Sequence, residues 1–443
     1  MNDIKFEKTK GGLGRQGLSE DAVSGLLMYL PSFPLSTLVN ASHAKIWDIV
    51  SMESGDALYV TKFTYPEQLA DCGIEKLAMD VETLSAITSV SDTKIKERSS
   101  VNALHYHVTE FFRMNPGGVL YVGLPSFDSA TELTAECVEA MQVYAGGSIR
   151  QMALLANGTT VIAGMQTEAE ALERSHMPLS LLFTTPGKTC VYSANTQSKW
   201  LPAYTAVSAL TLAKLKSSTA SDTFIAAGRS NVSFIAACDV DPQQIEDLGH
   251  YAYAGTIGAA LGALSRAAVN ESIAWVGKFP VGLSKPGLIS GESINAVAIA
   301  DLDAVNANRY VFVRTFNGDA GNYFNDSFTL DVETSDYAFI ENERTIDKMC
   351  REVFARLLPW LNSPVKVDAS TGKLDGGFCS FLETTAGSAI EDMEKAGEIS
   401  GYSVAIDPEQ NVLSTSVVEV VIRSVPTGIM RKVNVKIGFT TKI

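Results

Sequence analysis

The sequence has few cysteines, no apolar signal region at its N-terminus and no apolar run long enough to cross a bilayer. Its six cysteines are spread over 443 residues, mostly within apolar segments. This pattern predicts reduced core residues and no disulfide framework. The longest apolar stretch, 251–264, is too short and too rich in alanine and glycine to span a membrane. We therefore expect a chain that is made and kept in a cytoplasm, without direct membrane insertion.

The sequence also lacks a recognisable catalytic or metal-binding motif. It contains no Cys-x-x-Cys, His-Glu-x-x-His or Gly-x-Ser-x-Gly sequence and no acid-rich calcium loop. Its one close pair of histidines, His105 and His107, has an i, i+2 spacing, which points to different faces of a helix. We expect no cofactor and no metal, and an enzyme of this sequence would need catalytic residues that meet only in three dimensions.

Two partial nucleotide-binding motifs fail in their context. Gly12, Gly14 and Gly17 satisfy Gly-x-Gly-x-x-Gly, but the preceding strand-like segment alternates with charge, whereas a central parallel strand would be continuously apolar. The sequence PGKT at 186–189 resembles a P-loop, but Leu182 stands where that motif needs glycine. A flexible hinge explains the first motif better, and a turn explains the second.

Charge is distributed unevenly along the chain. Acidic residues outnumber basic ones by 50 to 35, and the formal net charge of −15 argues against nucleic acid as a partner of the bulk surface. Both ends are basic instead: residues 1–17 carry four basic and two acidic side chains, and residues 429–443 carry four basic and no acidic ones. Two basic ends on an acidic body favour attraction between copies, although lysines that keep edge strands soluble explain them about as well.

Helical and strand-like runs alternate along the first two thirds of the chain. The length and the 46% hydrophobic content predict two or three domains. The runs indicate an α/β fold with parallel or mixed sheets, followed after about residue 290 by a compact α+β domain. We divide the chain into an N-terminal extended arm (1–19), a first core part (20–125), an α/β middle domain (126–290), a C-terminal core domain (291–428) and a final strand (429–443).

Several local signals predict where helices begin and how one of them packs. Gly255, Gly258 and Gly262 place small residues near one helix face, which lets another backbone approach closely in a soluble core. Three helices are predicted to begin at polar capping residues: Ser19 before Glu20, Thr167 before EAEALERS, and Ser388 in a capping box with Glu391.

The last fifteen residues alternate apolar with polar side chains or glycine, which is the period of a half-buried strand. Because a single strand is unstable alone, its own domain or a neighbouring subunit must cover it. The N-terminal arm repeats the pattern on a smaller scale. We predict that both ends donate strands to neighbouring subunits. The exchanged apolar residues would be Ile4, Phe6, Val433, Val435, Ile437 and Phe439, and the hinges would be Gly11, Gly12, Gly14, Pro426 and Gly428.

Three segments together resemble one known family. They are LHYHVTEFFRMNPGGVLYVGL (104–124), DYAFIENERTIDKMCREVFARLLPW (336–360), and IEDMEKAGEISGYSVAID (390–407) followed by VVEVVIRSVPTGIMRKVNVKIGF (417–439). Their order and pattern resemble the contractile tail sheath proteins of bacteriophages and related injection machines. Residues 126–290 show no sequence that matches this family.

The resemblance implies a multidomain α/β and α+β protein, tail-sheath-like, with mixed sheets and exchanged terminal strands. It implies a structural subunit and no enzyme, polymerising as stacked hexameric rings around a tail tube and contracting to drive the tube through a cell envelope. The implied partners are further copies, the tail tube protein, and baseplate and tail terminator proteins. The implied locations are the host bacterial cytoplasm during assembly and then a virion tail or contractile injection particle.

One acidic helix is the candidate contact with the tube, through Glu391, Asp392 and Glu394, with Glu398 nearby. A solvated helix face explains these charges equally well, since exposed charge is the default for such residues. Two other functions stay open from the sequence: an α/β enzyme with an unrecognised active site, and a non-contractile virion assembly protein such as a capsid or adhesin component.

Overall fold

The computed structural model describes most of the chain and divides it into two compact units. Unit 1 comprises Met1–Ala268 and Ile273–Arg344, and unit 2 comprises Val269–Ser272 and Thr345–Ile443. The boundary that we expected near residue 290 therefore falls inside unit 1. The described residues are 20–30, 33–39, 46–76, 93–126, 133–155, 162–184, 188–194, 200–206, 210–219, 223–241 and 255–440.

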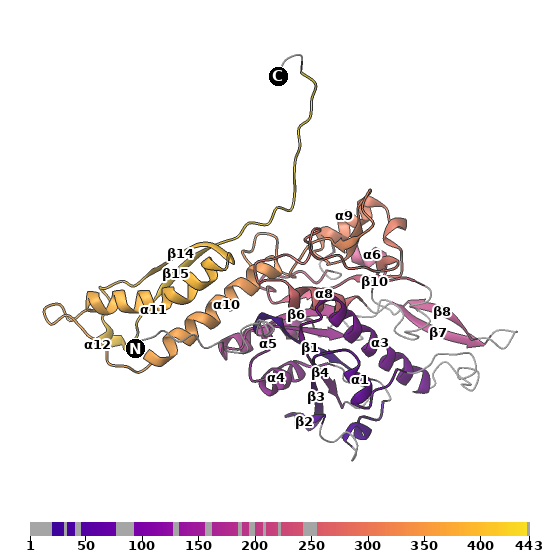
Figure 1. The fold of residues 1–443 in the computed structure, drawn as a ribbon, viewed down its shortest axis with the longest axis horizontal. Helices are drawn as coiled ribbons and strands as arrows, with labels where there is room; N and C mark the ends of the chain where they lie inside the picture. The colour runs from indigo at the N-terminus through magenta and orange to yellow at the C-terminus, as the bar shows by residue number, and fades with distance from the viewer. Residues whose placement is uncertain are drawn as a thin grey trace, which may run out of the picture. The chain divides into compact units, whose positions relative to one another are not determined.

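A seven-stranded mixed sheet forms the centre of unit 1, in the order β2-β3-β4-β1-β5-β6-β9 (Figure 1). Strands β1, β4, β5, β6 and β9 are parallel, and β2 and β3 add an antiparallel edge. The predicted α/β class with mixed strands is confirmed. The strand bounds are β1 (Val23–Met28), β2 (Asp48–Ser51), β3 (Ala57–Phe63), β4 (Val119–Pro125), β5 (Gln151–Leu155), β6 (Ser180–Thr184) and β9 (Val232–Phe234).

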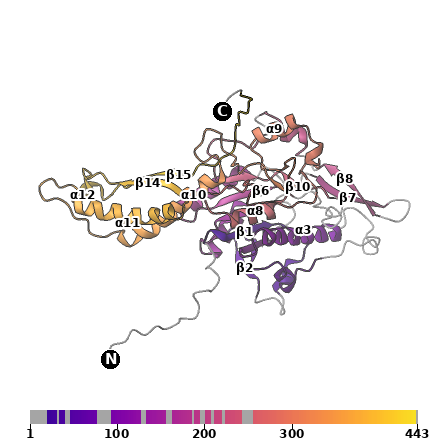
Figure 2. The same cartoon turned by 45° about the horizontal axis from the view of Figure 1, so that its top comes forward.

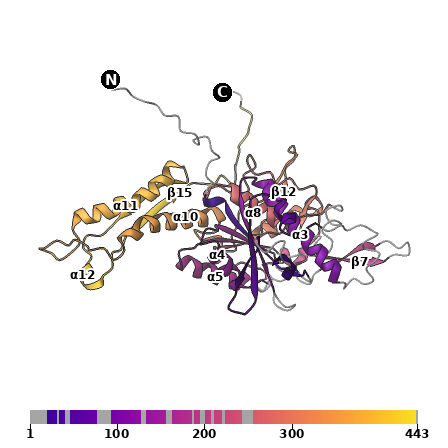
Figure 3. The same ribbon diagram turned by 60° about the horizontal axis from the view of Figure 1, so that its bottom comes forward.

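Helices cover both faces of this sheet (Figure 3). Helices α3 (Thr93–Met114) and α8 (Ile257–Arg266) pack on one face, and α4 (Ala135–Tyr144) and α5 (Ile162–Arg174) pack on the other. A hydrophobic core lies on each face of the sheet, and strand β1 contributes to both. Leu26 and Met28 belong to the core on the α3 side, and Leu27 belongs to the core on the α4 side. A strand covered on both faces reads as a nearly continuous apolar run.

That double burial explains an incorrect prediction at the start of unit 1. Glu20 does not begin an α-helix; η1 (Glu20–Ala22) is a single 3-10 turn and leads directly into β1. A short apolar run cannot be assigned to helix or strand by periodicity alone. The run forms a strand because it lies between β4 and β5 in the sheet. The α4 side packs closely against it, since a Cβ added at Gly25 would lie 2.9 Å from the Met141 side chain.

The other two predicted helix starts are also wrong. Thr167 lies exposed inside α5, five residues after the helix begins. Ser388 lies inside the 20-residue helix α11 (Gly376–Lys395), where its hydroxyl donates to the Thr385 carbonyl at 2.8 Å. The actual N-cap is Asp375, whose carboxylate accepts from the Phe378 amide at 3.2 Å.

The glycine prediction for α8 is confirmed at two of its three positions. Gly258 and Gly262 let α8 approach α3 so closely that an added Cβ would meet the backbone oxygens of His107 and Phe111 within 3.0 Å. Gly255 precedes the helix and faces Thr184 instead. The approach of two backbones therefore depends on small residues one helical turn apart.

Short two-stranded sheets and helices complete unit 1. Asn322–Phe324 forms a strand that pairs antiparallel with Val313–Thr315. The remaining elements are η2 (Leu35–Val39), α1 (Gln68–Asp71), β7 (Lys188–Ala194), β8 (Trp200–Ala206), α6 (Leu212–Leu215), β10 (Ala237–Asp239), β11 (Pro286–Leu288), η4 (Ile294–Ala296), α9 (Ile299–Ala307), β12 (Val313–Thr315) and β13 (Asn322–Phe324).

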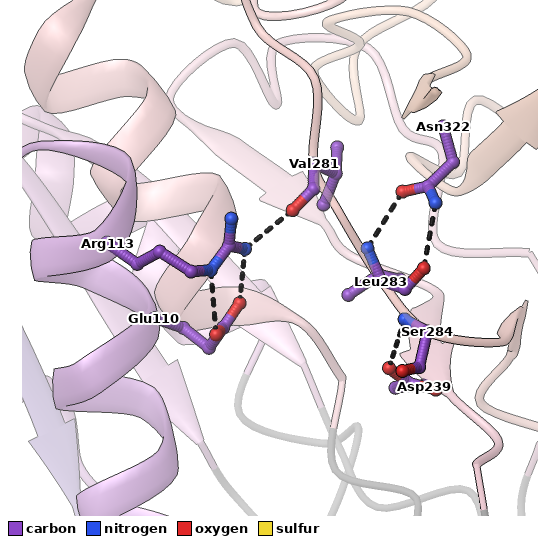
Figure 4. A network of polar contacts seen from close by, with 7 residues as sticks. All are labelled: Glu110, Arg113, Asp239, Val281, Leu283, Ser284 and Asn322. Atoms are coloured by element: carbon purple, nitrogen blue, oxygen red, sulfur yellow. Dashed lines mark hydrogen bonds and ion pairs between the residues drawn. The ribbon is translucent and has the colours of Figure 1, made fainter. Parts of the chain in front are cut away.

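The segment before β11, residues 279–285, is hydrogen-bonded to three separate elements, α3, β13 and β10 (Figure 4). Arg113 of α3 forms an ion pair with Glu110 and donates to the Val281 carbonyl at 2.5 Å. The amide of Asn322 pairs with both backbone groups of Leu283, at 2.9 and 3.0 Å. Asp239 accepts from the Ser284 amide at 2.9 Å. Segment 279–288 thus belongs to the core of unit 1.

His107 is fully buried under the α3–α8 contact, and neither ring nitrogen has a hydrogen-bond partner in the described structure. Burial therefore lowers the pKa of its imidazole to about 3. The unfolded chain binds this proton near pH 6.5 and the folded chain does not, so stability falls as pH drops below about 6.5.

We expect His107→Leu to flatten this pH dependence. The wild-type free energy of unfolding should lose up to about 1.4 kcal/mol more per pH unit than the variant between pH 6 and 4. Urea unfolding at several pH values measures both slopes, and His176→Gln, at an exposed histidine, is the control. Equal slopes for wild type and His107→Leu would contradict the assignment.

Unit 2 is a helix pair with a two-stranded sheet. Helix α10 (Ile340–Leu357) crosses the boundary between the units and is followed by η5 (Leu358–Trp360). Strands β14 (Ile399–Ala405) and β15 (Val421–Pro426) are antiparallel, flank α12 (Val412–Thr415), and lie against α11 (Figure 2). The α+β character predicted for this end of the chain is confirmed. Cys72, Cys137, Cys238 and Cys379 are buried as predicted, whereas Cys350 on α10 is exposed.

Candidate functional site

The β14–β15 hairpin of unit 2 has one apolar face and, among the described strands, an unpaired outer edge on β15. Ile422 faces the helices and packs with Met349, Ile390 and Ile399. Val421 and Val425 alternate with it and are exposed. A two-stranded sheet is marginal by itself and can accept another strand along such an edge.

The C-terminal arm, which we define as residues 427–440, leaves the hairpin from a fixed root. Pro426 pairs with Ile399 in the sheet, and its carbonyl accepts from the Ser400 hydroxyl at 3.1 Å. The amide of Asn270 donates to the Thr427 hydroxyl and to the Gly397 carbonyl, both at 3.0 Å. Of the two hinge residues predicted at this end of the chain, Pro426 therefore belongs to the fixed root. Gly428 follows the root, and a Cβ added there would meet no atom within 4 Å.

Residues 427–440 belong to no helix or strand, so the strand predicted from their alternation is not formed within one chain. Figure 1 shows them as an extended yellow trace after β15. Val433, Val435, Ile437 and Phe439 are 62%, 71%, 92% and 111% exposed, respectively. The chain's own fold leaves these apolar side chains in water. The corresponding N-terminal residues, Ile4 and Phe6, and the hinge glycines Gly11, Gly12 and Gly14 lie outside the described residues.

The candidate tube-contact residues lie on the exposed last turns of α11. Glu391 pairs with Lys395 at 2.7 Å, and Asp392 pairs with Arg356 at 3.2 Å. Glu394 is also exposed. Glu398 does not belong to this surface, because it is buried and pairs with Lys348 at 2.6 Å. The acidic surface is therefore smaller, and more nearly neutralised, than the sequence suggested.

An apolar groove of about 670 Å³ opens beside the hairpin in unit 2, where α10 ends and α11 begins. Its walls include Leu358, Leu361 and Leu413, which are 49%, 71% and 70% exposed. Val418 and Val420, immediately before β15, line the same groove. We did not predict this groove from the sequence, in which the apolar residues around Pro359 were the available signal.

No group of three or more His, Cys, Asp or Glu side chains among the described residues could hold a metal ion. Within the same residues, no helix is long and apolar enough to cross a membrane.

Two family descriptions match this chain. DUF2586, N-terminal domain, covers residues 71–328, and DUF2586, C-terminal domain, covers residues 336–443. The chain belongs to the DUF2586 family. No curated protein sequence matches it.

Three of the solved structures to which this DUF2586 protein is similar come from contractile particles. The anti-feeding prophage helical sheath in its contracted state has a TM-score of 0.54 at 13% identity, covering 99% of both chains. A chain of the anti-feeding prophage baseplate has a TM-score of 0.53 at 12% identity, covering 100% of this chain and 99% of that one. The sheath complex of the extracellular contractile injection system PVC, also contracted, has a TM-score of 0.51 at 11% identity, covering 100% and 98%. The predicted tail-sheath-like fold is thereby confirmed.

Proposed function

We propose that this DUF2586 protein is the structural subunit of a contractile sheath. The observation that carries the proposal is the sheath fold along essentially the full length of both chains, at TM-scores of 0.51 to 0.54. A single shared domain would leave the assembly open, because folds host many functions. Agreement over both units and the arm supports the same use of the whole chain, as stacked hexameric rings that contract around a tube.

Exchange of terminal strands would hold the subunits together. The exposed arm carries Arg431, Lys432 and Lys436 beside its apolar residues, on a chain whose formal net charge is −15. Main-chain hydrogen bonds along an open strand edge supply affinity, and opposite charges favour the correct approach. The N-terminal arm would donate a second strand in the same manner.

Negative-stain images of the purified protein test the proposal directly. A sheath subunit should form rings or tubes with helical striations. Discrete particles would favour an α/β enzyme, and tubes or shells that never shorten would favour a non-contractile assembly protein. Neither alternative has a particular observation in its favour.

The proposed partners follow from the assembly. Further copies of this chain come first, and a baseplate protein would terminate one end, as the similarity to a baseplate chain supports. A tail tube protein would fill the lumen, and a terminator would cap the other end. The particle would assemble in the host bacterial cytoplasm and act as a virion tail or injection particle.

Reversing the charge of the α11 surface should weaken assembly on tubes. Glu391→Lys with Glu394→Lys should lower co-sedimentation with tube protein about tenfold. The unfolding curve should shift only slightly, because both side chains are exposed and the Glu391–Lys395 pair that is lost lies on the surface. Glu173→Lys with Glu333→Lys makes the same charge change at exposed positions of unit 1 and is the control. Unchanged co-sedimentation would count against the tube contact and favour a merely solvated helix face.

Stiffening the N-terminal arm should block contraction without blocking assembly. Gly11→Pro with Gly12→Pro removes the backbone freedom that a moving arm needs between subunits. Extended tubes of this variant should stay extended when mild denaturant triggers the wild type, and electron microscopy measures their length. Normal shortening would refute the hinge assignment while leaving the sheath assignment intact.

A further inference from the structure

We propose that the apolar groove of unit 2 receives Ile437 and Phe439 from the C-terminal arm of a second copy. The inference rests on the proposed function and adds a defined binding site to it. The groove supplies a place for apolar side chains, and the arm supplies side chains that its own chain leaves exposed.

The geometry of β15 connects the strand edge to the groove. Ile422 faces the helices, and Val420 and Val418 continue at the same two-residue spacing into the groove wall. Residues two apart share one face of an extended chain. The groove therefore lies on the helix-facing side of the chain that leads into β15, before the strand begins at Val421.

An arm that pairs antiparallel with β15 would run from the Pro426 end toward the Val421 end and then over the groove. Residues 427–440 span about 46 Å when extended, at about 3.3 Å per residue, whereas the six residues of β15 need about 20 Å. The first apolar pair, Val433 and Val435, would cover the hairpin edge. The second pair, two and four residues further on, would then reach the groove.

The groove has the size and chemistry for this occupant. Its volume of about 670 Å³ lies within the range of ordinary binding pockets, and its walls combine aliphatic side chains with Trp360 and Phe378. Strand addition gives affinity through the backbone and specificity through pockets for alternate side chains. Ile437 and Phe439, at the i, i+2 spacing, are such alternate side chains.

Cysteine cross-linking between full-length chains tests the site. One chain carries Leu413→Cys and the other Phe439→Cys, both in a Cys350→Ser background because Cys350 is exposed. Mild oxidation of the mixture under assembly conditions should give a covalent dimer at least ten times more abundant than the control pair Ile299→Cys and Phe439→Cys. Ile299 is the matched control, as it is a highly exposed apolar residue of unit 1.

Every other outcome overturns the inference. A further chain carries both Leu413→Cys and Phe439→Cys. If this chain forms an internal disulfide and no covalent dimer, the arm folds back on its own subunit. Another outcome of this kind is cross-linking of Leu413→Cys to Phe6→Cys in preference to Phe439→Cys, which would assign the groove to the N-terminal arm. Tubes without the Leu413–Phe439 cross-link would reject the groove site alone. Discrete particles without any cross-link would reject the sheath function as well.

Discussion

Deletion of residues 429–443 is expected to leave a folded, soluble protein that forms no tubes. The arm makes no strand within its own chain, and its alternating apolar side chains Val433, Val435, Ile437 and Phe439 are exposed, so its loss removes little from the isolated fold. In the assembly, burial of those side chains is worth at least about 1.5 kcal/mol each, or roughly 6 kcal/mol together. That is about four powers of ten in an association constant.

Sedimentation and negative-stain microscopy across a concentration series measure this effect. The control is a chain that lacks only residues 441–443 and keeps every apolar residue of the arm. Circular dichroism and urea unfolding check that the truncated protein remains folded. Tubes of normal length from the 429–443 deletion would rule out donation of this strand.

Gly258→Ala is expected to lower the free energy of unfolding by about 2–3 kcal/mol. The added methyl group would meet the backbone of His107 on α3, which cannot move aside as a flexible side chain could. Gly164→Ala is the matched control, because this glycine is exposed on α5 and an added Cβ meets nothing within 4 Å. That control should raise stability by about 0.5–1 kcal/mol through a better helix propensity.

Urea unfolding followed by circular dichroism compares the two glycine variants with the wild type. Opposite signs are the expected result. Equal small changes at both positions would show that α8 can shift away from α3 at little cost, and that the close approach is not required for stability.

Local sequence signals sufficed where an element has one buried face. Val101, Leu104 and Val108 have the spacing of a single helix face and lie in α3, and the strand-like run at 56–65 contains β3. Such signals failed where burial is two-sided or where a helix begins with glycine. Strand β1 reads as a helix until β4 and β5 are placed beside it, and α11 begins at Gly376, twelve residues before the capping box that appeared to start it.

The sequence by itself determined the mixed α/β class, the small-residue face of α8 and the unfinished apolar pattern of the arm, because each depends on residues near one another in the chain. Tertiary structure alone decided which neighbours cover β1, that Asn270 secures Thr427 from 157 residues away, and that Leu361, Leu413 and Val418 form one groove. These features depend on residues distant in sequence. No local period encodes such contacts, and only the packing of the folded chain brings the groups together.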